Sequence, residues 1–197
     1  MRRGFKSEAE RLADRTRDQM DLQPHAPLPI RRLAQHLHVE VYAADRLVDR
    51  EMLVELDEEQ PGAFSAATFH LPGGRTAVVY NPFSDEGRTN SDLAHEFAHI
   101  LLSHEVRELQ QIGGHTFFTC DPEQEAEANW LAGCLLLPRT LLLKEAYSGA
   151  DAAAIATRHQ VSLPMARFRL NTSGVLLQVR RGGGARTARS PLNDEPT

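Results

Sequence analysis

Apolar residues recur along the first part of the chain with two different spacings. In residues 5–20 they fall three or four positions apart between charged residues, which predicts an amphipathic helix. A second helix is expected to begin at Pro29 and to continue through the segment IRRLAQHL. The segment VEVYA at 39–43 alternates apolar and polar residues instead, as a short strand does. Residues 51–60 favour neither spacing clearly.

Two longer strands are expected at 63–71 and 75–81, on either side of Pro72-Gly73-Gly74. These three residues favour a tight turn, so the two strands should form a hairpin. From strand order alone, we take strand 75–81 as a candidate free edge, along which an extended peptide could pair.

The rest of the chain predicts mainly helices. Thr89, Asn90 and Ser91 offer caps for a helix that should run from about Ser91 to His104. After a loop at 105–120, Asp121 and Pro122 favour the start of a helix that should end before Pro138. Further helices are expected over 139–147 and as a pair within 151–173, joined at Val161-Ser162.

This order of elements predicts an α+β fold, with a small twisted β-sheet packed against a mostly helical body. We expect an N-terminal helical extension at 1–24 and one domain at 25–177 that includes the helix pair 151–173. Residues 178–197, rich in arginine and glycine, lack any periodicity and predict a disordered tail.

Composition narrows the class of protein without identifying it. The chain has 197 residues, of which 41% are hydrophobic, and this is enough for one domain with a core. Its formal charge of -5 gives no overall attraction to nucleic acid or to anionic membranes. The two cysteines do not make a disulfide framework, and the charged N-terminus lacks the apolar stretch of a secretory signal. No apolar run is long enough to cross a bilayer. We therefore expect a cytoplasmic protein without a membrane partner.

The strongest chemical signal is His95-Glu96-x-x-His99 on the predicted helix. A step of four residues turns a helix by only about 40° past a full circle, so both imidazoles project from one face and can reach one cation. Glu96 lies on the adjoining face, where it can act as general base and then carry a proton to the leaving amine. Without its context, the same pattern could also be an exposed helix with two chance histidines.

The third metal ligand must come from another segment, because His104 is five residues past His99 and should point away from the pair. The next helix carries Glu123, Glu125 and Glu127, which cannot all face one way. Glu125 shares a face with Asn129, which could hold a ligating histidine as a second-shell partner. Glu125 is therefore our first choice, Glu127 the second and Glu123 the third.

Two neutral imidazoles and one carboxylate suit zinc and leave its fourth position for water. Such an ion lowers the pKa of that water to about 7, which peptide hydrolysis at neutral pH requires. Ligand type alone leaves Mn²⁺ and Fe²⁺ as alternative metals.

The segments LAHEFAHILLSH and EAEANWLAGCLLLP together resemble the ImmA/IrrE metallopeptidases, and the resemblance covers about residues 25–177. Two small departures are Ala98, where many members carry glycine, and Leu131, where phenylalanine is common. The resemblance implies a zincin-like fold with the HExxH helix in the core. It also implies a gluzincin-like zinc protease with His95 and His99 as ligands, Glu96 as the base and Glu125 as the third ligand.

What the family does supplies an expected function. Its members cleave helix-turn-helix transcriptional repressors and so release stress-response or mobile-element genes. The resemblance thus implies an intracellular zinc endopeptidase whose partner is such a repressor. The alternative is a DNA-binding or partner-binding regulator, antitoxin-like or sensor-like, that keeps the metal site without proteolytic turnover.

Weaker signals leave several roles open. The segment AAIATRHQVSLPMARFRL has helix-turn-helix spacing, so Arg167 and Arg169 could contact DNA phosphates, but we favour the interpretation that these helices pack on the protease core. His115 and Tyr80 are candidates for contacting the oxyanion or the substrate. The same residues could equally be an ordinary surface histidine and a tyrosine without a role in the chemistry.

Overall fold

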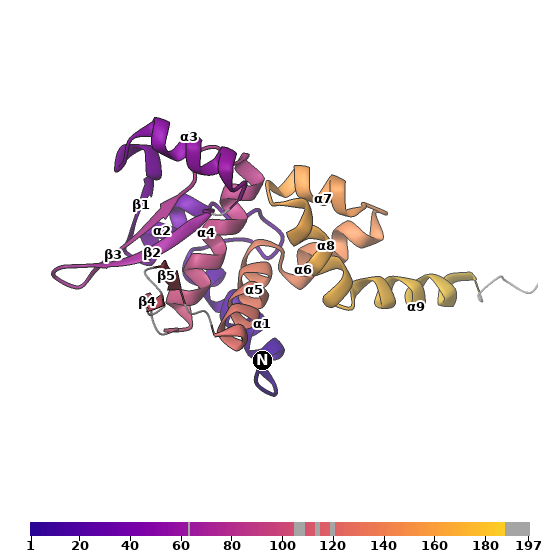
Figure 1. The fold of residues 1–197 in the computed structure, drawn as a ribbon. Coiled ribbons are helices and arrows are strands. Elements are labelled where there is room, and N and C mark those ends of the chain that lie inside the picture. The colour runs from indigo at the N-terminus through magenta and orange to yellow at the C-terminus, as the bar shows by residue number, and fades with distance from the viewer. Residues whose placement is uncertain (63, 105–108, 113–114, 119–120, 188–197) are drawn as a thin grey trace, which may run out of the picture.

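The computed structural model describes residues 1–62, 64–104, 109–112, 115–118 and 121–187. It confirms the α+β fold: a small sheet lies beside a mostly helical body, and helices α4 and α5 run between the sheet and the C-terminal helices (Figure 1). The helices are α1 Phe5–Gln19, α2 Ile30–His36, the short 3-10 helix η1 Ala44–Arg46, α3 Arg50–Glu59, α4 Glu86–Leu101, α5 Pro122–Leu136, α6 Arg139–Tyr147, α7 Ala152–His159, α8 Leu163–Thr172 and α9 Val175–Thr187.

The main sheet has the order β1-β3-β2, with β1 Val39–Ala43, β2 Ala66–Leu71 and β3 Arg75–Tyr80. β1 is parallel to β3, and β2 is antiparallel to it through the expected hairpin, in which Gly73 and Gly74 take positive φ angles. The hypothesis that strand 75–81 is a free edge is wrong, because β3 is paired on both sides. Among the described strands, β2 is instead the edge strand that packs on α4.

The core is built around α4 and α5, which pack side by side and also contact α1 and the sheet (Figure 1). Leu93 and Phe97 on α4 and Leu131 on α5 are completely buried. So are the small residues Ala98 and Ala128, which allow the two helices to approach closely. The HExxH helix is therefore held firmly in the core, as the resemblance implied. Helix α1 shares this core, while the predicted domain boundary after residue 24 stays a prediction.

Helix α4 begins earlier than expected. Asp85 is its N-cap, and its side chain accepts a hydrogen bond from the Arg88 backbone N–H at 2.7 Å, so the prediction of a start near Ser91 was wrong by more than one turn. Aspartate caps a helix as well as the threonine, asparagine and serine that we expected to do so. The hydrophobic pattern did not indicate Asp85, because the first turn that follows it is polar. The ambiguous segment at 51–60 is helix α3, which is capped by Asp49.

The pair α7 and α8 packs against α4 and α5, as we favoured. Gly133 on α5 allows Arg169 of α8 to approach so closely that a Cβ there would lie 2.4 Å from its side chain. Near the turn between α7 and α8, the Ser162 backbone N–H donates to Ser91 Oγ at 2.9 Å. Arg169 is completely buried and donates to the Leu137 carbonyl and to Glu10, so it cannot contact DNA.

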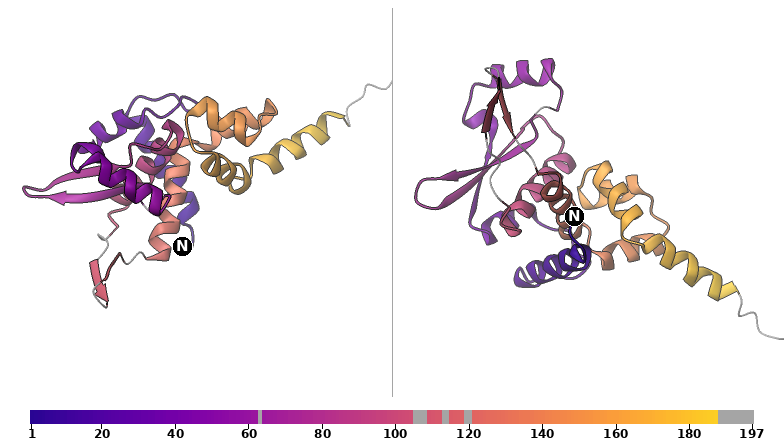
Figure 2. Two further views of the ribbon diagram at one scale, coloured as in Figure 1. Left: turned by 45° about the horizontal axis from the view of Figure 1, so that its top comes forward. Right: turned by 60° about the horizontal axis from the view of Figure 1, so that its bottom comes forward.

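Two predictions of irregular structure need correction. The tail expected at 178–197 is helical up to Thr187, because α9 packs on α6, with Val175 buried and Arg139 bonded to Gln178. Helix α9 points away from the sheet in both views of Figure 2, and residues 188–197 lie outside the described part. The loop expected at 105–120 contains two short antiparallel strands, β4 Leu109–Ile112 and β5 His115–Phe118. In the described part of the chain, no helix is both long and apolar enough to cross a membrane.

Candidate metal centre

The two histidines of the HExxH motif converge as the helical spacing predicts. The Nε2 atoms of His95 and His99 are 3.0 Å apart on neighbouring turns of α4. Glu125 approaches them from α5, with carboxylate oxygens 3.2 Å from His95 Nε2 and 3.5 Å from His99 Nε2. These three residues form a group that could hold a metal ion.

The spacing of the three donors fits a tetrahedral ion. With bonds of about 2.0–2.1 Å, two ligand atoms on a tetrahedral zinc lie about 3.3–3.4 Å apart, close to the separations found here. All three side chains keep some exposure, between 14% and 28%, so a substrate can reach the point on which they converge. Neutral imidazole nitrogens and a carboxylate are also the donors that zinc accepts. The residues present therefore fit the implied metal.

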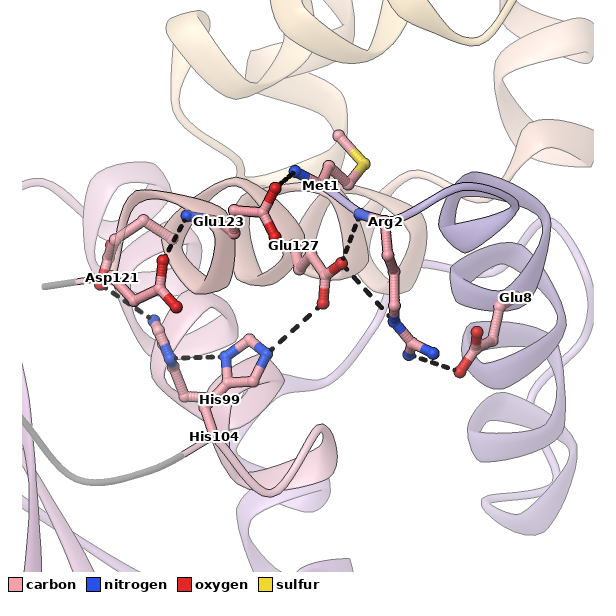
Figure 3. A network of polar contacts seen from close by, with 9 residues as sticks. Met1, Arg2, Glu8, His99, His104, Asp121, Glu123 and Glu127 are labelled. Carbon is pink, nitrogen blue, oxygen red and sulfur yellow. Dashed lines mark hydrogen bonds and ion pairs between the residues drawn. The ribbon is translucent and has the colours of Figure 1, made fainter.

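The sequence left open which of the three carboxylates of α5 lies near the histidines, and the structure gives them different partners. Glu125 faces the histidines, whereas Glu123 Oε1 is 3.0 Å from the N-terminal amine of Met1 (Figure 3). Glu127 Oε1 accepts a hydrogen bond from the Arg2 backbone N–H at 3.1 Å. The two alternative ligands thus make contacts with the N-terminal segment, and Glu125 is the carboxylate of α5 that lies against the two histidines.

A fourth residue, His104, contacts this group from the side of His99. We expected it to point away, but its Nδ1 atom is 3.0 Å from Nδ1 of His99 (Figure 3). Helix α4 ends at Leu101, and Ser103 takes a left-handed φ of 51°, so the backbone N–H of His104 donates back to the His99 carbonyl at 3.0 Å. This is a Schellman motif, which reverses the chain at the end of a helix. The prediction assumed that the helix continued through His104, and the reversal makes it wrong.

The contacts of His104 define a consistent arrangement of protons. If Nε2 of His99 faces the metal, its Nδ1 carries the proton and donates to Nδ1 of His104. Nε2 of His104 then carries a proton toward Glu127 Oε2, which is 3.8 Å away. Burial lowers the pKa of His104, a shift that Glu127 and Glu125 oppose, and the neutral ring is the form that can accept from His99. Thus α4 and α5 both contribute to orienting the ligand ring.

The proposed base is held by a residue that the sequence did not single out. Glu96 is buried, and its Oε2 accepts a hydrogen bond from the Thr68 hydroxyl at 2.6 Å. Thr68 lies on the edge strand β2, and Figure 1 shows this strand crossing near α4. The sequence predicted that Thr68 lies on a strand ahead of the motif. It could not predict the contact with Glu96, because local residue patterns do not show which strand residue packs against the helix.

The remaining candidates are placed as follows. Asn129 is exposed and lines a cavity next to His95, so its role as second-shell partner stays a prediction. Tyr80 is not brought to the site: its hydroxyl accepts from Arg31 at 2.9 Å, and it lines a separate cavity without the metal-centre residues. The side chain of His115 lies outside the described part of the structure.

Comparison with known protein families gives a match that spans this site. Residues 52–171 match the model of the peptidase M78 family, described as the IrrE N-terminal-like domain. The match includes the segments that carry His95, His99 and Glu125. Searches of the curated proteins and of the solved structures found no match.

Proposed function

We propose that this chain, which belongs to the peptidase M78 family of IrrE N-terminal-like domains, is a zinc-dependent endopeptidase. The observation that carries the proposal is the convergence of His95, His99 and Glu125, with Glu96 next to His95 on the same helix. A structural metal site would not need a buried carboxylate beside its ligands. Hydrolysis needs one, because a base must take a proton from the attacking water.

The residues of the chain have separate tasks in this reaction. When bound, the cation polarises the water and the substrate carbonyl, which is chemistry that the side chains alone do not supply. Glu96 accepts the proton of the attacking water and passes it to the amine that leaves. Thr68 holds one oxygen of Glu96, so the carboxylate keeps a fixed direction throughout. His104 and Glu127 keep the ring of His99 turned toward the point of convergence.

The edge strand gives the substrate a place to pair. In the described part of the sheet, β2 is paired with β3 on one side only. An extended peptide added along its other edge would make main-chain hydrogen bonds next to Thr68 and Glu96. Such pairing requires a substrate segment that is unfolded or able to extend, which suits a limited cut in one exposed loop.

The substrate we propose is a helix-turn-helix transcriptional repressor, whose cleavage would release stress-response or mobile-element genes. This part rests on the resemblance of the two motif segments to ImmA/IrrE proteins. A cytoplasmic location also stays a prediction. Direct DNA binding by α8 receives no support from Arg169, which is buried in contacts with Leu137 and Glu10.

The test separates catalysis from metal binding. Purified wild type, Glu96→Gln and His99→Ala are compared for zinc content and for cleavage of a co-encoded helix-turn-helix protein. We expect Glu96→Gln to keep zinc and to lose at least about 100-fold in cleavage rate, the lower end of what a general base contributes. His99→Ala should lose both. The matched control is Glu58→Gln, an exposed position on α3, which should behave as wild type. Cleavage by Glu96→Gln at the wild-type rate would show that the proposed mechanism is wrong.

A further inference from the structure

A cavity of about 590 Å³ opens beside the metal ligand His95. Helices α4, α5 and α8 contribute to its wall, so it lies between the HExxH helix and the helix pair that follows the protease motifs. Cavities of about 300–1,000 Å³ are the usual size for sites that hold small molecules or peptide side chains. Its position next to His95 makes it continuous with the metal centre.

The wall formed by α5 and α8 is mostly apolar and aromatic, with Asn129 as a polar member. The rings of Trp130 and Phe168 meet edge to face, with centroids 5.6 Å apart, and Met165 and Pro164 line the cavity beside them. Arg88 and Asp92 of α4 also line it and form an ion pair with a 2.9 Å contact. The charges of this pair neutralise each other, and the remaining surface of the cavity is mostly apolar, with Ser65, Ser91 and Asn129 among its uncharged polar residues.

The wall is rigid because α8 is fixed from behind. Arg169, on the buried side of α8, is bonded to the Leu137 carbonyl and to Glu10, and Gly133 allows this close contact with α5. The cavity is therefore formed before any ligand arrives.

We propose that this cavity is the subsite that receives a large apolar side chain, aromatic or long aliphatic, next to the scissile bond of the substrate. The proposal rests on the proposed peptidase function, which it deepens by naming the chemistry of the substrate. It also assigns a task to the helix-turn-helix-like pair: α8 selects the substrate side chain through Pro164, Met165 and Phe168. The cavity exceeds one side chain in volume, so the backbone on either side of that residue also fits.

Binding of small chelators tests the subsite without turnover. The hydroxamates of phenylalanine, leucine, alanine and glutamate are titrated into the zinc-loaded Glu96→Gln protein, and fluorescence of Trp130, the single tryptophan of the chain, reports binding. We expect the phenylalanine and leucine compounds to bind roughly tenfold or more tightly than the alanine compound, and the glutamate compound to bind most weakly.

Three variants show whether the cavity causes this preference. Phe168→Ala removes half of the aromatic pair, and Pro164→Glu places a charge in the wall at a position where the first turn of α8 tolerates an acidic residue. In both, the phenylalanine-to-alanine affinity ratio should fall to about twofold. Met52→Ala, an exposed position on α3 that does not line the cavity, should leave the ratio unchanged. Equal binding of all four compounds by the parent protein, or a ratio that survives in both cavity variants, overturns the subsite.

The two proposals fail in different ways. If hydroxamates bind with apolar preference but no protein substrate is cut by the wild type, the peptidase function fails, and the cavity stands only as a binding pocket for an apolar side chain. If no hydroxamate binds the zinc-loaded protein, the proposed open metal site is wrong, and the cavity is tested in the metal-free protein. There, N-acetyl-phenylalaninamide should change the fluorescence of Trp130 to saturation while N-acetyl-alaninamide does not. No change with either compound would overturn the subsite.

Discussion

The Nδ1 atom of His104 lies 3.0 Å from the Nδ1 atom of His99, so the ring of a predicted metal ligand is held from behind by a second histidine. Glu127 then faces His104 and in turn accepts the backbone N–H of Arg2. Figure 3 shows these contacts as one continuous chain from α4 to the N-terminal segment. The candidate metal centre is therefore in contact, through His99, with residues that lie outside the HExxH motif.

Replacing His104 should weaken metal binding without abolishing it. In His104→Ala, the ring of His99 loses its acceptor, and we expect zinc affinity to fall by about 10- to 100-fold. Competition with a fluorescent zinc chelator measures this change. His104→Gln, which keeps an acceptor at similar reach, should recover part of the affinity, and His36→Ala, an exposed histidine on α2, should have no effect. Wild-type affinity in His104→Ala would show that the contact does not orient His99.

Substitutions of the three carboxylates of α5 should reduce the zinc content of the protein to different extents. Glu125→Ala removes the proposed third ligand, so most of the bound zinc should be lost on dialysis. Glu127→Ala acts only through His104 and should weaken binding by about 10- to 100-fold. Glu123→Ala, at a position 70% exposed, should retain wild-type content. Elemental analysis after dialysis measures all three, and a greater loss from Glu127→Ala than from Glu125→Ala would overturn the assignment.

Arg169 should contribute to stability rather than to DNA binding. Arg169→Ala leaves the Leu137 carbonyl and Glu10 without their partner inside the protein, and we expect the free energy of unfolding to fall by about 3 kcal/mol. Arg167→Ala, on the exposed side of the same helix, should change it by less than about 0.5 kcal/mol. Urea denaturation compares the two. If the two substitutions had equal effects, the buried contacts of Arg169 would not matter for folding.

The carboxylate of Asp92 should give a pH-dependent stability difference. Burial raises the pKa of Asp92, and the charge of Arg88 opposes this shift. A carboxyl group with a raised pKa in the folded state destabilises the fold when it is ionised. Asp92→Asn should therefore be more stable than wild type at pH 7. This advantage should disappear as the pH falls below about 3.9, where Asp92 is protonated in both the folded and the unfolded wild type.

Urea denaturation of both proteins at several pH values checks the sign. The difference between the two unfolding free energies is the quantity of interest, because acid-induced effects of other groups cancel in it. A wild type that is more stable than Asp92→Asn at pH 7 would mean that the ion pair with Arg88 outweighs burial.

Most elements of the fold followed from local patterns. The strand at Val39–Ala43 and the helix at Arg139–Tyr147 lie where the residue spacing predicted them. The misplaced start of α4 has a local cause, because Asp85 caps a first turn that carries no apolar residues. The helical part of the C-terminal segment could not be predicted, since α9 is stabilised by packing on α6 rather than by its own periodicity.

The sequence by itself determined the pairing of His95 with His99 and the place of Glu96 beside them, because the geometry of one helix sets the direction of residues one turn apart. Only the tertiary structure decided that Glu125 faces this pair, that Thr68 meets Glu96 and that His104 turns back onto His99. Those contacts join separate elements or cross the end of a helix. They depend on how the elements pack and where the chain reverses, which no local spacing of residues records.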